Sequence, residues 1–189
     1  MRVIPFPAAD LCSRCYRNRV KDELSLNTNH KIDLRPIGPG DEDFLYRVYA
    51  SVRGEELAAC GWSEEQQRLF LNMQLKARDQ SYSMYYPELD DKIVLLNAEP
   101  VGRLIVSRSE EAIRLVDVTL LPESRGAGIG TTLIGDLSTE ADAANKTIRL
   151  QVERTNPQAL SLYQRLGLLI TSETQTHIQM ERTGQKSKV

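Results

Sequence analysis

Three glycines at alternate positions form the segment of this sequence best suited to bind an anion. Gly126, Gly128 and Gly130 follow a strand-like run, Val116–Leu121, and come directly after Arg125. Glycines in this spacing leave backbone N–H groups unobstructed, and the start of a helix adds about half a positive charge. A phosphate or a pyrophosphate is therefore the expected ligand of this turn.

The common nucleotide-binding motifs do not fit the turn. A Rossmann motif has G-x-G-x-x-G directly after its strand, whereas residues 122–125 separate the strand from the glycines here. A P-loop closes with Gly-Lys-Ser/Thr, and this turn has no lysine. Glycines used only for close packing of a helix remain an alternative, but packing explains neither the alternation nor Arg125.

A second motif begins at Asn156, where residues 156–168 read NPQALSLYQRLGL. Together with RGAGIG at residues 125–130, it resembles the two signatures of the GNAT superfamily of N-acetyltransferases. These signatures are R/Q-x-x-G-x-G/A and N-x-x-A-x-x-L-Y-x-x-L-G-F, and the departure in the second is Leu168 in place of Phe. The resemblance covers about residues 32–181.

This resemblance implies that acetyl-CoA is the cosubstrate. The edge of the strand at Val118 and Leu120 is expected to pair with the pantetheine amides and to polarise the thioester carbonyl. Asn156 is expected to reach the cofactor arm, although it would serve equally well as a helix N-cap. The residues expected to hold the pyrophosphate, mainly through backbone amides, are Arg125, Gly126, Ala127, Gly128, Ile129, Gly130 and Thr131.

Acetyl transfer to an amine also needs a general acid and a general base. The resemblance implies that Tyr163 protonates the CoA thiolate, because a phenol with a pKa near 10 keeps its proton at neutral pH. A tyrosine that only packs in the helix is the alternative. Asp117 is the candidate base, with Glu111 and Glu153 as further candidates. Alternation along the strand does not decide which face meets the substrate.

In such folds the first two helices and their loop select the acceptor. Glu55 and Glu56 are candidates to receive a cation, while Trp62 and the aromatic residues of segment 82–87 are candidates for a wall. Packing is the alternative role for the aromatic residues. Residues 32–181 carry 15 basic and 23 acidic side chains, a net of −8. This charge favours a cationic acceptor and argues against a nucleic-acid partner.

Hydrophobic periodicity predicts the elements that must position these residues. Their order is β-α-α-β-β-β-α-β-α-β-β, and the resemblance implies an α/β fold with a GNAT-type mixed central sheet. The resemblance implies a splay between the strands at about 113–121 and 147–152. Residues 53–62 are expected to connect the first two helices, which lie at about 41–52 and 63–77. The other helices are expected at 128–144 and 157–165, and the other strands at 32–37, 93–96, 101–106, 168–172 and 175–181.

Composition sets the domain organisation and the compartment. The 189 residues are 41% hydrophobic and 26% charged, which corresponds to one globular domain at 32–181. Residues 1–31 read as an N-terminal extension and residues 182–189 as a basic tail. No apolar run reaches membrane-spanning length, and neither a secretory signal nor a disulfide framework is evident, so we expect a cytoplasmic protein without membrane partners. Cys12 and Cys15 have metal-ligand spacing, but too few further ligands exist to predict a metal.

Together these observations predict an acyl-CoA-dependent N-acyltransferase. It would move acetyl from acetyl-CoA to a primary amine, on a small molecule or a peptide, by direct attack in a ternary complex. The expected state is a monomer or a homodimer. The alternatives are a non-catalytic acyl-CoA sensor and an interaction module that works through its basic N-terminal arm.

Overall fold

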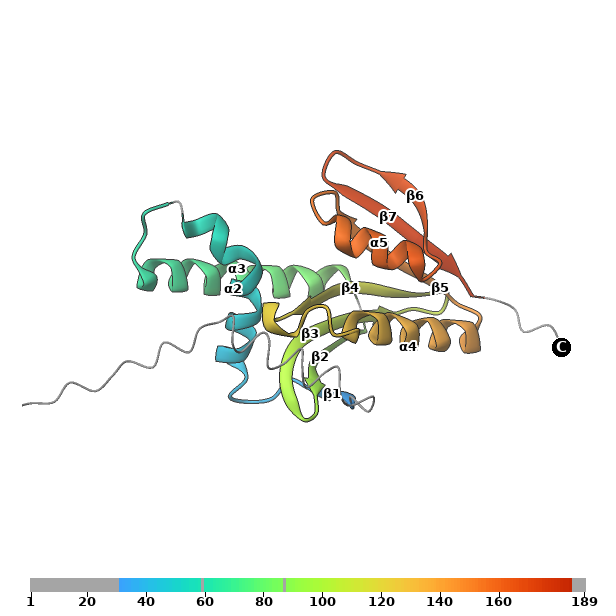
Figure 1. The fold of residues 1–189 in the computed structure, drawn as a ribbon, viewed down its shortest axis with the longest axis horizontal. Coiled ribbons are helices and arrows are strands. Elements are labelled where there is room, and N and C mark those ends of the chain that lie inside the picture. Colours follow the sequence, from blue (N-terminus) through green and yellow to red (C-terminus); the bar gives the residue numbers. More distant parts are fainter. Residues whose placement is uncertain (1–30, 59, 87, 185–189) are drawn as a thin grey trace, which may run out of the picture. The chain divides into compact units, whose positions relative to one another are not determined.

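The computed structural model describes residues 31–184, except for residues 59 and 87 (Figure 1). The side chains of residues 55, 56 and 58 also lie outside the description. The predicted N-terminal extension, with Cys12 and Cys15, and residues 185–189 of the predicted tail lie outside the described residues as well.

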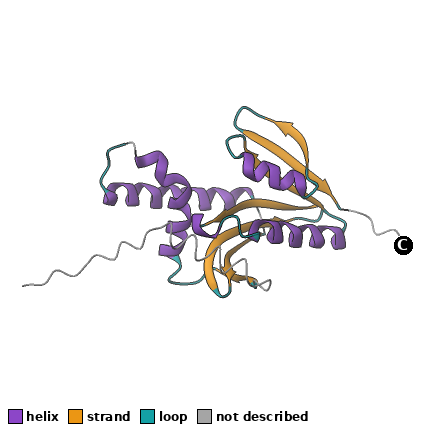
Figure 2. Cartoon of the chain, in the orientation of Figure 1, coloured by secondary structure: helices purple, strands orange, loops and turns teal. Residues whose placement is uncertain are grey.

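Within these residues, seven strands form one sheet in the order β1-β2-β3-β4-β5-β7-β6 (Figure 2). The sheet is antiparallel except for the pair β4–β5. The strands are β1 (Ile32–Pro36), β2 (Leu89–Leu96), β3 (Glu99–Arg108), β4 (Ala112–Leu120), β5 (Thr147–Glu153), β6 (Leu169–Glu173) and β7 (His177–Thr183). The helices are α2 (Glu42–Ala58), α3 (Glu64–Tyr85), α4 (Ile129–Ala144) and α5 (Pro157–Arg165), with a 3-10 turn η1 (Pro122–Ser124).

The order of the elements agrees with the prediction, but two helix boundaries are wrong. Residues 53–58, expected in a connection, continue α2, and α3 extends to Tyr85 rather than to about residue 77. Glycine inside a helix costs about 1 kcal/mol, and Gly54 therefore suggests a break. Leu57 nevertheless packs against the cluster of Tyr49, Leu71 and Leu75 that joins α2 to α3, and this packing favours a longer helix.

The predicted splay is present where β4 and β5 meet. Their parallel pairing runs only from Ala112 opposite Thr147 to Leu115 opposite Leu150. Beyond these pairs β4 stays paired with β3, and β5 stays paired with β7, so the two strands separate. A bulge in the β3–β4 ladder lies at the same level, because Ile105 pairs with Asp117 whereas Val106 pairs with Leu115. Bulges bend a strand and increase its local twist, which favours the separation.

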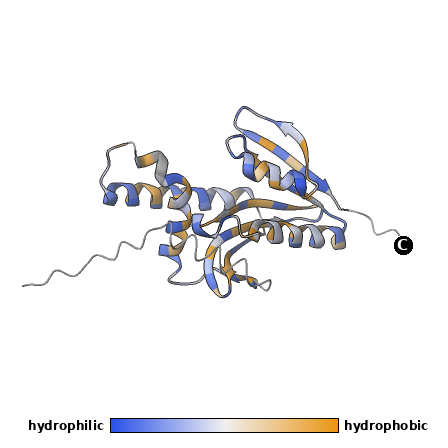
Figure 3. Cartoon of the chain, in the orientation of Figure 1, coloured by the Kyte–Doolittle hydropathy of each residue, from blue (hydrophilic) through white to orange (hydrophobic). Residues whose placement is uncertain are grey.

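The main core lies between the central strands and α4. Val118 and Leu120 of β4 pack against a buried cluster that includes Ile129 and Leu133 of α4 and Tyr163 of α5. Hydrophobic residues recur along β3, β4 and α4 (Figure 3). One face of β4 is therefore committed to the core beside α4, and its other face, with Asp117 and Thr119, is left for α2 and α3.

Candidate active site

Two glycines of the turn after β4 adopt a left-handed backbone. Gly126 has φ +81° and Gly128 has φ +80°, and a Cβ added at either position would meet nothing within 4 Å. Gly128 is the N-cap of α4, and its carbonyl accepts the first helical bond, from the N–H of Thr132 at 3.0 Å. The N–H groups of the first helical turn therefore lack helical partners, and they border open space that suits an anion.

The third glycine of the turn has a different role. A Cβ at Gly130 would come within 3.3 Å of Cδ2 of Leu162. Since Gly130 lies in α4 and Leu162 in α5, this glycine permits the close approach of the two helices. The packing explanation thus holds for one of the three glycines, and backbone conformation explains the other two.

The side chains of Arg125 and Asn156 both make hydrogen bonds that stabilise local structure. The Nε of Arg125 donates to the carbonyl of Leu120 at 2.9 Å and so ties the turn to the end of β4. The side-chain oxygen of Asn156 accepts from the N–H of Ala159 at 3.0 Å, which caps α5 directly before Pro157. Both side chains are exposed. Ile129 is buried in the core, so it presents only its backbone to the turn.

A cavity of about 220 Å³ lies against β4 on the side of α2 and α3. It is lined by Asp117 and Thr119 of β4 and by Glu153 at the end of β5, which are the two strands that splay apart. Tyr49 of α2 and Tyr82 of α3 also line it. Asp117 points into this cavity beside the splay. The structure therefore decides which face of β4 carries Asp117, a point that alternation along the strand left undecided.

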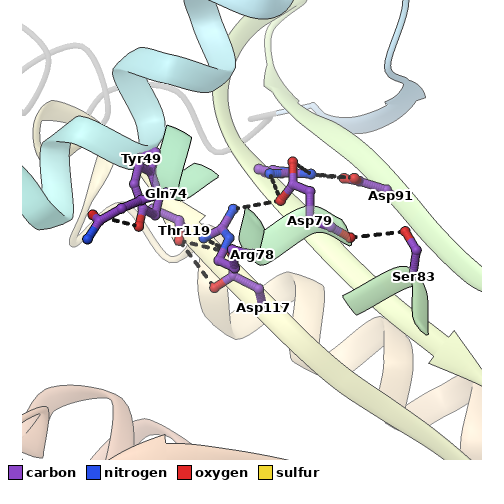
Figure 4. A network of polar contacts seen from close by, with 9 residues as sticks. Tyr49, Gln74, Arg78, Asp79, Ser83, Asp91, Asp117 and Thr119 are labelled. Atoms are coloured by element: carbon purple, nitrogen blue, oxygen red, sulfur yellow. Dashed lines mark hydrogen bonds and ion pairs between the residues drawn. The ribbon is translucent and has the colours of Figure 1, made fainter. Parts of the chain in front are cut away.

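Asp117 lies in an environment that changes its proton affinity. Burial raises the pKa of Asp117, and the positive charges of Arg78 and Arg103 partly offset this effect. The Nη1 of Arg78 lies 3.4 Å from Oδ2 of Asp117, and the hydroxyl of Thr119 lies 3.4 Å from its Oδ1 (Figure 4). A carboxylate with a raised pKa is a better proton acceptor near neutral pH than an exposed one.

Tyr163 is buried in the core cluster beside α4, with 6% of its surface exposed. Burial raises the pKa of Tyr163 to about 12, and the negative charge of Asp117 acts in the same direction. This electrostatic effect means that the two side chains, from α5 and β4, lie close enough to influence each other. The phenol therefore stays protonated across the whole range in which proteins normally work.

The remaining predicted residues divide into those near the cavity and those away from it. Glu153 lines the cavity, whereas Glu111 lies at the opposite end of β4, where its carbonyl accepts from the N–H of Thr147. Trp62 packs edge-on against Phe70, with ring centroids 5.1 Å apart, and does not line the cavity. Glu55 and Glu56 belong to α2, but their side chains lie outside the described residues.

Two arginines that the sequence did not single out shape the same region. Arg103 of β3 is 3% exposed and pairs with both Asp91 and Asp79, at 2.9 and 3.0 Å. These bonds attach α3 to β2 and β3, and they compensate the buried charge. Arg78 of α3 lines the cavity next to Asp117. No local sequence motif predicts a role for either residue, because their partners are distant in sequence.

Residues 31–184, less the gaps named above, hold no group of three or more side chains that could bind a metal ion. None of the described helices is both long enough and apolar enough to cross a membrane.

Comparisons with known proteins identify the family. The model of the acetyltransferase (GNAT) family matches residues 45–168. A search of curated proteins gives no significant match. Similar solved structures include the PaiA N-acetyltransferase of Thermoplasma acidophilum in complex with coenzyme A. It is 19% identical to this chain, the TM-score is 0.59, and the match covers 81% of this chain and 99% of that chain. An acetyltransferase from Thermus thermophilus gives 21% identity, a TM-score of 0.58, and coverage of 81% and 97%.

Proposed function

The chain belongs to the acetyltransferase (GNAT) family, and on that basis we propose that it transfers acetyl from acetyl-CoA to a primary amine in a ternary complex. One observation carries this proposal. The gap between β4 and β5 opens beyond Leu115 and Leu150, with the glycine turn at the end of β4 and the cavity at Asp117 on the α2–α3 side. A thioester and an amine can therefore approach each other from the two sides of the sheet.

The turn and the strand edge would hold the cofactor. The backbone amides of residues 126–131 would bind the pyrophosphate, since open space borders Gly126 and Gly128. The unpaired edge of β4 at Val118 and Leu120 would bond the pantetheine amides, as a strand added to a sheet edge does. An amide of this edge would also stabilise the negative charge that develops on the thioester oxygen. Asn156 would add a contact from the start of α5.

The proton steps would use the two groups with raised pKa values. A new N–C bond forms between amine and acetyl carbon while the C–S bond breaks. Asp117, with Glu153 as the alternative base, would accept the proton that the amine loses. Tyr163 would donate its proton to the departing thiolate and recover one from solvent. The free carboxylate and the neutral phenol are the correct starting forms for these two transfers.

An acceptor screen tests the proposal. The full chain is incubated with acetyl-CoA and a panel of amines, and the release of free thiol is followed. Amine-dependent thiol release, with the acetylated amine identified by mass spectrometry, is the expected result. Acetyl-CoA binding without turnover on any amine would instead favour the acyl-CoA sensor.

A further inference from the structure

Arg78 is held in place by aromatic rings rather than by strong ion pairs. Its guanidinium carbon lies 4.8 Å from the ring centroid of Tyr49 and 5.5 Å from that of Tyr82. Its contacts with Asp79 and Asp117 are both 3.4 Å, at the long end of the hydrogen-bond range (Figure 4). Its Nε is buried and makes no hydrogen bond within the described residues. The side chain is 22% exposed and lines the cavity, where, among the described residues, only these long contacts engage its Nη atoms.

Arg103, in the same cluster, differs from Arg78 because it makes several short hydrogen bonds to carboxylates. It makes paired bonds to both oxygens of Asp79, each at 3.0 Å, and further bonds to Asp91. Both carboxylate oxygens of Asp79 therefore already accept hydrogen bonds from Arg103. Asp117 is left as the main acid facing Arg78, at a distance that gives a weak bond. The positive charge of Arg78 is thus available to a further anion.

The cavity therefore has groups of both signs within a short distance. Asp117 and Glu153 lie on the strands beside the splay, whereas Arg53 and Arg78 lie on the helices. Its volume of about 220 Å³ is below the range of about 300–1,000 Å³ typical of sites for drug-sized ligands. The matching ligand is a small molecule that carries an amine and an anion close together.

The geometry points to an α-amino acid, or a compound with the same adjacent amine and carboxylate, as the acceptor whose carboxylate binds Arg78. This inference rests on the proposed function. The amine would take the place of Arg78 beside Asp117, while the carboxylate takes the place of Asp117 beside Arg78. The net charge of the domain favours a cationic acceptor, whereas the pair of Asp117 and Arg78 favours a zwitterionic one.

Matched acceptors test this inference on the wild-type chain. Each of the common amino acids is compared with its carboxamide and with the amine that lacks the carboxylate, and both kcat and KM are measured. We expect the KM of the preferred amino acid to be about 10- to 100-fold lower than that of its two analogues, as the loss of a hydrogen bond to a charged group implies. Carboxamides, simple amines or polyamines that are used as well as amino acids would overturn the inference.

Variants at Arg78, with a matched control at Arg68, assign the effect to one residue of α3. Arg78→Gln should raise the KM for the amino acid about 10- to 100-fold, leave the KM for acetyl-CoA unchanged, and abolish the preference over the carboxamide. Arg78→Lys should retain part of the preference. Arg68→Gln is the matched control, because Arg68 also stacks on a tyrosine of α2, Tyr46 at 4.9 Å, and pairs with an aspartate, Asp43, but does not line the cavity. An unchanged preference in a folded Arg78→Gln protein would refute the assignment.

Binding measurements separate the two proposals. Calorimetry with CoA present measures the affinity for the amino acid without turnover. If amino acids bind in an Arg78-dependent way but no thiol is released, the ligand class stands and the proposed catalysis fails. If simple amines are acetylated and amino acids neither bind nor react, the catalysis stands and this inference fails.

Discussion

Replacing Tyr163 with phenylalanine separates proton donation from packing. The ring of Tyr163 is 6% exposed, and phenylalanine fills the same buried space without the hydroxyl. General-acid catalysis typically contributes about 10²–10⁴-fold to a rate. Because a water molecule can replace the missing donor, we expect kcat to fall by about ten-fold or more, at or below the low end of that range. The KM for acetyl-CoA should change little, since the proposed pyrophosphate site is the glycine turn at residues 126–131.

The pKa of Tyr163 gives this variant a second, independent readout. Below pH 10 the hydroxyl keeps its proton in both the folded and the unfolded chain. Between pH 10 and the folded pKa of about 12, the unfolded chain loses this proton while the folded chain retains it. The free energy of unfolding should therefore fall by about 1.4 kcal/mol per pH unit, or about 2–3 kcal/mol in total. Tyr163→Phe lacks this contribution and should become more stable relative to wild type as the pH rises through this window.

Both readouts use standard measurements. Single-turnover thiol release reports the chemical step, and urea unfolding at pH 9 and pH 12 reports the difference in stability between the two proteins. Full kcat in the phenylalanine variant, measured where chemistry limits the rate, would remove Tyr163 from the mechanism. A stability difference that does not change with pH would show that the hydroxyl is not held in a buried environment.

Three further predictions concern the turn, the cap and the buried arginine. Gly128→Ala and Gly40→Ala place a side chain at φ +80° and +94° with open space beside each, so both variants should lose about 1 kcal/mol of stability. Only Gly128→Ala should raise the KM for acetyl-CoA, and equal KM values in the two variants would argue against a pyrophosphate site at the turn. Asn156→Ala should lose about 1 kcal/mol in urea unfolding while Asn156→Ser retains the cap, and a raised KM for acetyl-CoA in both would assign the amide a contact with the cofactor. Arg103→Met leaves two aspartates without their buried partner and should cost about 3–5 kcal/mol, whereas a loss below 1 kcal/mol in urea unfolding would contradict the network.

Local patterns were enough to predict most of the fold. The alternation and helical periodicity predicted the order of the elements, the glycine spacing predicted the turn, and the resemblance to the GNAT superfamily implied the splay. The extent of α2 was missed because Gly54 is a local signal for a break, while the packing of Leu57 that overrides it depends on α3. The orientation of Asp117 was also beyond local pattern, because the packing of α4 on the opposite face of β4 decides it.

The cavity's arginines could not be found from sequence spacing. Arg103 bonds residues 12 and 24 positions away, and Arg78 contacts Asp117 at a separation of 39 positions. Charged residues in helices and strands are usually exposed, so their types alone suggest a solvated surface. Only the docking of α3 on the sheet brings these side chains into one cluster.

The short β4–β5 ladder has a consequence for how the domain opens. Four residue pairs join the strands β1–β4 to the strands β5–β7, whereas the antiparallel ladder between β5 and β7 has seven pairs. Native proteins open locally in cooperative units that often coincide with supersecondary motifs. Amide hydrogen exchange in residues 147–183 should therefore report a sub-global opening that leaves the strands before it protected. Asn156 and Tyr163 lie in this C-terminal unit and the glycine turn lies outside it, so a ligand that contacts both would suppress the opening and couple the two parts of the domain.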